Sequence, residues 1–164
     1  MIERKEKTSV LFVCMGNICR SPTAEGVFRK LVADAGLDEQ IHVESAGTHA
    51  YHTQEPPDRR AQAAAERRGF NLSGIRARRV SENDFVQFDL ILAMDNLNLV
   101  TLQDRAGEDS TSSIRLFLEF SETARETEVP DPYYGGTAGF ERVLDIVEVA
   151  AEGLLRKIRK EHLP

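Results

Sequence analysis

Short apolar runs alternate with longer segments of helical periodicity along this chain, and that alternation predicts its fold class. Four runs are typical of buried strands, namely Val10–Val13, Ile41–Val43, Leu90–Ala93 and Ile114–Leu118. Because helical patterns separate these runs, we expect the strands to lie parallel in one sheet. The sequence therefore predicts an α/β fold, in which helices cover both faces of a parallel sheet.

The segments between the runs carry helix signals. Apolar residues recur at helical spacing after Pro22 until Gly36 provides a stop signal. Residues 58–68 are rich in Ala and Arg, SEND at 81–84 resembles a capping box that opens a short helical turn, and a helix is expected over 96–105. The last helix is the clearest, with an apolar stripe made of Phe140, Val143, Leu144, Val147, Ala151, Leu154, Leu155 and Ile158.

Length and composition narrow the class of protein. The 164 residues suit one domain, which we place at 9–164 after a short charged extension at 1–8. Without a long apolar run or a secretory signal, the chain is expected to be soluble and cytoplasmic and to bind no membrane. A net charge of −6 argues against general nucleic-acid binding. Arginines between 59 and 79 are interpreted as a solvated helix face, with steering of anionic substrates as the alternative.

The strongest chemical signal is VLFVCMGNICRS at 10–21. A predicted strand ends at Cys14, a short loop follows, and Arg20 stands before the helix-start signal of Ser21 and Pro22. A loop that opens a helix turns backbone N–H groups toward one point, and the arginine fork fits a tetrahedral oxyanion. The same positive field favours the thiolate form of the cysteine. The motif indicates an anion site with a nucleophile at its floor; the alternative is a structural cysteine followed by a surface arginine.

A second candidate group lies in VPDPYYGG at 129–136. Asp131 stands between two prolines that stiffen the loop, and Gly135 and Gly136 let it turn. Expulsion of an alkoxide or phenoxide from a phosphate ester calls for a proton from a nearby carboxylic acid. We expect apolar neighbours to favour the protonated form of Asp131. The alternative is an ordinary Pro-Asp-Pro turn.

These motifs resemble those of the low-molecular-weight protein tyrosine phosphatases, and the bacterial look of residues 45–60 indicates a bacterial-type member. CMGNICRSP at 14–22 and DPYYGG at 131–136 match the signatures of that family. The resemblance extends from about Ser9 to about Lys160 and includes SAGT at 45–48, PPDRR at 56–60 and AMD at 93–95. It implies a single-domain, doubly wound, Rossmann-like fold with a four-stranded parallel sheet.

The resemblance also implies an activity, the hydrolysis of phosphotyrosine monoesters through a cysteinyl-phosphate intermediate. Cys14 is implied as the nucleophile, Arg20 as a ligand of the phosphoryl oxygens and Asp131 as the general acid. No metal or other cofactor is implied, because the loop and the arginine supply the positive charge. The implied phosphate-binding loop contains Met15, Gly16, Asn17, Ile18, Cys19 and Ser21.

Supporting roles follow from the same resemblance. Asn17 is expected in left-handed backbone with Ser45 as its hydrogen-bond partner. Ser21 either stabilises the thiolate or only caps the helix. Cys19 either pairs with Cys14 under oxidation or only packs the loop.

The implied substrate cleft has aromatic walls. Tyr51 and Tyr133 would flank a phenyl ring, although Tyr51 has the alternative of an ordinary surface tyrosine. Tyr134 matches a second tyrosine of the cleft. At Gly74 many relatives have a histidine, so we expect altered support for the loop, and Asp95 resembles a family aspartate to which no role is assigned.

Three rival functions share parts of this pattern. Arsenate reductase would need cysteines beyond Cys19, and the chain has none. Protein-arginine phosphatases resemble CTGNTCRS, with a threonine where Ile18 stands here. A non-catalytic phosphate-binding module would lose the nucleophile or the acid. The expected partners are tyrosine-phosphorylated proteins, a bacterial tyrosine kinase among them, with the chain as a monomer or weak dimer.

Overall fold

The computed structural model describes residues 7–49, 51–133 and 135–163 and contains one parallel sheet. Its strand order is β2-β1-β3-β4. The strands are β1 (Thr8–Cys14), β2 (Ile41–Gly47), β3 (Leu90–Ala93) and β4 (Ser113–Leu116). Most of the predicted charged extension, residues 1–6, lies outside the described residues, and β1 already begins at Thr8.

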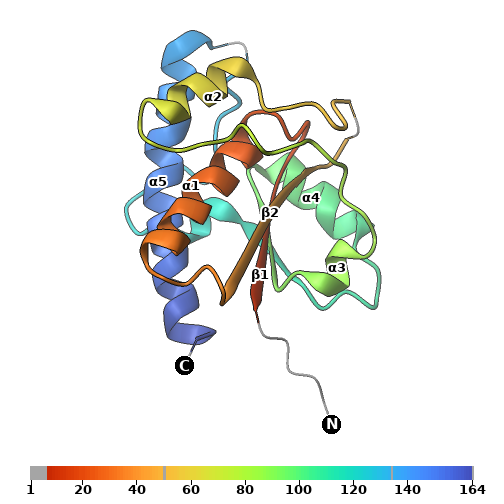
Figure 1. Cartoon of the computed structure of the whole chain (residues 1–164). Coiled ribbons are helices and arrows are strands. Elements are labelled where there is room, and N and C mark those ends of the chain that lie inside the picture. Colours follow the sequence, from red (N-terminus) through yellow and green to blue (C-terminus); the bar gives the residue numbers. More distant parts are fainter. Residues whose placement is uncertain (1–6, 50, 134, 164) are drawn as a thin grey trace.

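Helices cover both faces of the sheet (Figure 1). One side carries α1 (Arg20–Asp34), α2 (Arg59–Glu66) and the long α5 (Gly136–Glu161). The other side carries α3 (Asp84–Gln87) and α4 (Asn96–Arg105). The predicted four-stranded, doubly wound α/β fold is confirmed. Within the described residues, no helix combines the length and the apolarity that a membrane span requires.

The continuous apolar run of β1 is explained by burial on both faces, since successive side chains of a strand point to opposite sides. Val10 and Phe12 belong to the larger core under α1 and α5, whereas Leu11 and Val13 belong to the smaller core under α3 and α4. The ring of Phe12 makes edge-to-face contacts with Phe28 of α1 at 5.8 Å between ring centroids. The strand β1 therefore packs against both helical layers, and it ends at Cys14.

The fourth predicted strand, Ile114–Leu118, was too long. The strand β4 ends at Leu116, and a 3-10 helix, η1 (Phe117–Phe120), follows. Phe117, Leu118 and Phe120 are all buried there. A single helical turn brings these neighbouring apolar side chains into one core, which the alternating faces of a strand cannot do.

The predicted start of α1 was also misplaced. The helix begins at Arg20, with Cys19 in the cap position and no side-chain cap, so Ser21 does not act as a helix cap. Pro22 still falls in the first turn, where a backbone N–H has no partner within the helix. The Ser21 hydroxyl instead lies 3.0 Å from the sulfur of Cys14.

One glycine is required by close packing between α5 and η1. A Cβ atom at Gly153 would collide with the carbonyl oxygen of Phe120. Gly153→Ala is therefore expected to lower the free energy of unfolding by about 1–3 kcal/mol through overpacking, although alanine is the better helix former. Chemical denaturation measures this change.

Gly107→Ala is the matched control, because a Cβ at Gly107 meets no atom within 4 Å. Its free energy of unfolding should change by no more than about 0.5 kcal/mol. If Gly153→Ala were as stable as the original chain, the close approach of α5 to Phe120 would be contradicted.

Candidate active site

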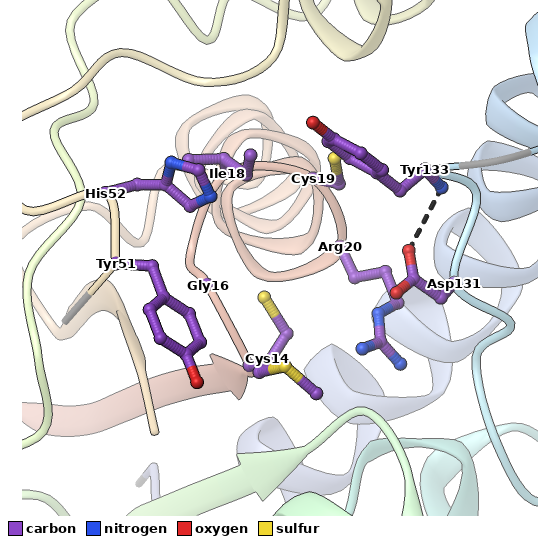
Figure 2. Close-up of a pocket in the computed structure, with 10 residues that line it drawn as sticks. Cys14, Gly16, Ile18, Cys19, Arg20, Tyr51, His52, Asp131 and Tyr133 are labelled. Carbon is purple, nitrogen blue, oxygen red and sulfur yellow. Dashed lines mark hydrogen bonds between the residues drawn. The ribbon is translucent and has the colours of Figure 1, made fainter. Parts of the chain in front are cut away.

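The loop between β1 and α1 forms the floor of a cavity of about 400 Å³. It lies at the carboxyl end of β1, where the winding of the sheet reverses between β1 and β3 and where ligands bind in such folds. Figure 2 shows the side chains around this cavity. The lining residues are Cys14, Met15, Gly16, Ile18, Cys19, Arg20, Tyr51, His52, Asp131 and Tyr133.

Cys14 is only 3% exposed, and its sulfur is surrounded by donors. The backbone N–H of Asn17 donates to Sγ at 3.3 Å, and Ser21 Oγ lies 3.0 Å from the same atom. Both groups can donate hydrogen bonds to a sulfur anion.

Asn17 holds the loop in its tight conformation. Its φ of 58° places it in the left-handed region that asparagine tolerates better than most residues. Its side-chain Nδ2 donates to Ser21 Oγ at 2.8 Å and to Ser45 Oγ at 3.0 Å, so the structure brings together the pair that the sequence predicted. Its Oδ1 accepts from the N–H of Arg78 at 3.0 Å.

The network continues to a carboxylate that the sequence analysis missed. Ser45 Oγ donates to Glu25 Oε1 at 2.6 Å, and Arg29 Nε lies 2.9 Å from Glu25 Oε2. Burial raises the pKa of Glu25 above its ordinary value. A Glu–Arg pair four residues apart is usually an exposed helix pair, so only the burial of α1 distinguishes this one.

Gly74 is exposed and a Cβ there would meet nothing within 4 Å, so the loop is supported from elsewhere.

Arg20 is 4% exposed and is held by two acceptors. Its Nη1 donates to Asp95 Oδ2 at 2.7 Å and to the carbonyl of Val129 at 3.1 Å. Burial disfavours the charged form, but the negative charges of Cys14 and Asp95 outweigh it, so the pKa of the guanidinium is raised. Asp95 also caps α4 by accepting from the N–H of Asn98. The sequence assigned no role to Asp95. The structure shows that it holds Arg20 and caps α4.

Cys19 lies in the same loop but in a different environment. It is buried, and burial together with the nearby charge of Asp58 raises the pKa of its thiol. Both cysteines are free thiols in this structure. The two sulfurs of the loop are therefore distinguished by their surroundings: donors surround Cys14, whereas burial and a carboxylate keep Cys19 protonated.

Asp131 stands at the rim of the cavity beside Arg20 (Figure 2). Its Oδ1 accepts from the N–H of Tyr133 at 3.0 Å. The apolar surroundings predicted for this carboxyl group are not present, since Asp131 is exposed. Val129 turns its side chain into the core and its carbonyl toward Arg20, which leaves the aspartate on the open side of the loop.

Tyr51 and Tyr133, the tyrosines expected to form the walls of a substrate cleft, both line the cavity. Tyr51 and His52 lie on one side and Tyr133 on the other (Figure 2). Tyr51 is 69% exposed and stacks on the His49 ring at 5.1 Å between centroids. His52 was not predicted, because one histidine in a loop carries no recognisable signal. Tyr134 lies outside the described residues.

Among the residues that the structure describes, no group of three or more His, Cys, Asp and Glu side chains is arranged to hold a metal ion. Arg20 brings a positive charge to the lining of the cavity.

Comparison with known proteins agrees with this geometry. The family model for low molecular weight phosphotyrosine protein phosphatase matches residues 9–163. A putative low molecular weight protein-tyrosine-phosphatase of Synechocystis is 46% identical over 154 residues, which are 93% of this chain and 97% of the relative. The low molecular weight protein-tyrosine-phosphatase YfkJ of Bacillus subtilis is 45% identical over 153 residues, again 93% of this chain and 97% of the relative.

A solved structure extends the comparison to three dimensions. The protein tyrosine phosphatase of Entamoeba histolytica, with Hepes in its active site, has a TM-score of 0.90 and 44% identity. The match covers 94% of this chain and 98% of that chain. The chain therefore belongs to the low molecular weight phosphotyrosine protein phosphatase family, and it is a phosphatase enzyme.

Proposed function

We propose that this enzyme hydrolyses phosphotyrosine in proteins through a cysteinyl-phosphate intermediate on Cys14. The observation that carries the proposal is the meeting of a donor-surrounded sulfur and a buried guanidinium in one loop. The sulfur of Cys14 accepts a hydrogen bond from the Asn17 N–H. Arg20, which lines the same cavity, is held by its hydrogen bond to Asp95. The similarity to protein-tyrosine-phosphatases of Synechocystis and Bacillus subtilis supports the same substrate class.

In the first step the Cys14 thiolate attacks phosphorus, an S–P bond forms and the bond from phosphorus to the phenolic oxygen breaks. Arg20 and the loop N–H groups stabilise the charge on the equatorial oxygens, which is the main demand of phosphoryl transfer. Asp131 donates its proton to the departing oxygen. The exposed position of Asp131 in the lining of the cavity supports this role, because a leaving group at the cavity mouth could reach it.

In the second step a water molecule attacks the cysteinyl phosphate. Asp131, now ionised, takes the proton of this water, the S–P bond breaks, and the thiolate and inorganic phosphate are released. Asp131 thus alternates between acid and base. Asn17 and Ser21 again stabilise the sulfur as it regains its negative charge.

The shape of the cavity supports an aryl substrate. Tyr51 and Tyr133 offer aromatic faces on opposite sides, between which the phenyl ring of phosphotyrosine would pack. Tyrosine-phosphorylated proteins, including a bacterial tyrosine kinase, are the proposed substrates, and the chain acts as a monomer or weak dimer. A cytoplasmic location fits because thiols stay reduced there.

Cys14→Ser is expected to lower turnover by more than about 10³-fold, since a serine hydroxyl has no activating base here. The variant should still bind inorganic phosphate or vanadate, because Arg20 and the loop N–H groups remain. Hydrolysis of p-nitrophenyl phosphate and calorimetric titration measure the two properties. Appreciable turnover by the variant would remove Cys14 from its assigned role.

Asp131→Asn is expected to slow hydrolysis of phenyl phosphate by about 10²-fold or more, because a poor leaving group needs a proton. The loss should shrink as the phenol becomes more acidic. Values of kcat/KM for a series of aryl phosphates test this dependence. An equal loss for every phenol would rule out a general acid at this position.

Ile18 lines the cavity and is expected to set the preference between phosphotyrosine and phosphoarginine. Ile18→Thr should raise relative activity on phosphoarginine peptides several-fold, because the hydroxyl can accept a hydrogen bond from a guanidinium. Ile18→Val, which trims the side chain without adding a hydroxyl, should leave the ratio unchanged. The ratio of kcat/KM for the two peptides is the measurement, and an unaltered ratio in Ile18→Thr would assign the preference elsewhere.

A further inference from the structure

The loop that carries Asp131 is anchored at two ends, and the first anchor is Val129. The N–H of Val129 donates to the carbonyl of Met94 at 2.7 Å. The carbonyl of Val129 accepts from Arg20 at 3.1 Å. This end of the loop is therefore attached to the phosphate-binding arginine itself. Asp131, two residues further on, is exposed, so its position depends on how the other end of the loop is held.

The second anchor is Arg60, in the first turn of α2. Its Nη1 donates to the carbonyl of Tyr133 at 3.0 Å. The guanidinium carbon also lies 5.2 Å from the centroid of the Tyr133 ring and 4.8 Å from that of Phe140. The N–H of Tyr133 in turn donates to Asp131. One arginine thus contacts both the backbone and the ring of the residue that is hydrogen-bonded to the proposed acid.

Asp58 connects this arginine to the phosphate-binding loop. Its carboxylate accepts from Arg60 Nε at 3.1 Å and from Nη2 at 2.9 Å, a bidentate arrangement. Its backbone N–H donates to the carbonyl of Ile18 at 2.8 Å. The side chain of Asp58 is only 13% exposed. The contacts therefore run without a break from the loop of Cys14 through Asp58 and Arg60 to Tyr133.

Hydrogen bonds from Arg60 lower the pKa of Asp58 below its ordinary value. A group with a lowered pKa keeps its charge, and the stability that the charge brings, until the pH falls through that lowered value. The pair thus stays intact at pH values where an ordinary aspartate begins to take up a proton.

We propose that Arg60 and Asp58 form a bridge that sets the position of Asp131 relative to the phosphate held above Cys14. The proposal rests on the function proposed above for Asp131. Arg60 is a positioning residue, since it contacts the carbonyl and ring of Tyr133 and acts on the reaction through that contact. Small displacements of a catalytic group are costly, because proton transfer needs hydrogen-bond distance in the transition state.

The test is the dependence of kcat/KM on the leaving group. Arg60→Gln should lower kcat/KM for phenyl phosphate about tenfold, less than Asp131→Asn does, because a displaced acid still acts in part. For a dinitrophenyl phosphate, whose oxygen leaves without a proton, the loss should be small. The line relating kcat/KM to the acidity of the phenol should therefore become steeper. Arg60→Lys, which keeps the charge but loses the planar fork, should fall in between.

Arg68→Gln is the matched control. Arg68 lies just beyond the end of α2 and pairs with Glu141, Asp145 and Glu148 of α5. Like Arg60, which packs on Phe140, it joins the α2 region to α5. Its loss should lower stability and leave the leaving-group dependence unchanged. A steepened dependence in Arg68→Gln would show that general loosening of α2, and not the bridge, is responsible.

The double variant Arg60→Gln/Asp131→Asn separates the two proposals. If Arg60 acts through Asp131, the double variant should be no slower than Asp131→Asn alone. Additive losses, or an Arg60→Gln loss that is equal for all phenols, would overturn the bridge while Asp131 keeps its role. A flat leaving-group response in Asp131→Asn itself would instead overturn the proposed acid.

Discussion

A buried positive charge beside a donor-surrounded sulfur is the interaction on which this molecule depends. Removing a guanidinium from water is costly unless hydrogen bonds and opposite charge replace the lost solvation. Arg20 receives both from Asp95 and from the carbonyl of Val129. The same two contacts bring the β3–α4 turn and the loop of Asp131 to the cavity. Satisfying one buried cation therefore also assembles the walls of the cavity.

Contacts from several segments hold the loop around the sulfur, and they keep Asn17 in its strained left-handed conformation. A left-handed residue other than glycine persists when the surrounding structure determines it more than once. Asn17 contacts Ser21, Ser45 and the backbone of Arg78, which belong to three different segments. Glu25 in turn accepts a hydrogen bond from Ser45. These contacts are already formed before a substrate binds. The loop therefore needs little reorganisation to bind a phosphate.

The fold was largely predictable because its signals are local. The buried strand β1, the helix at 96–105 and the apolar stripe of α5 follow from periodicity within one segment each. The errors arose where a tertiary contact overrides the local pattern. Core packing turns Phe117–Phe120 into a 3-10 helix, and the Ser21 hydroxyl lies against the sulfur of Cys14 and does not cap α1. The exposure of Asp131 depends on the direction in which its loop runs, and the apolar residues next to it in the sequence did not reveal that direction.

By itself, the sequence determined the order of strand, cysteine, loop, arginine and helix, and with it the location of the proposed anion site. These groups lie within seven positions of one another, so the geometry of the backbone is enough to bring Cys14 and Arg20 together. Glu25 lies in a segment without a motif, and the motifs that contain Asp95 and Arg60 did not reveal what these side chains contact. Their roles arise from partners 20, 75 and 73 positions away in the chain. Only the tertiary structure could decide them, because contacts at that separation depend on how whole helices pack against the sheet.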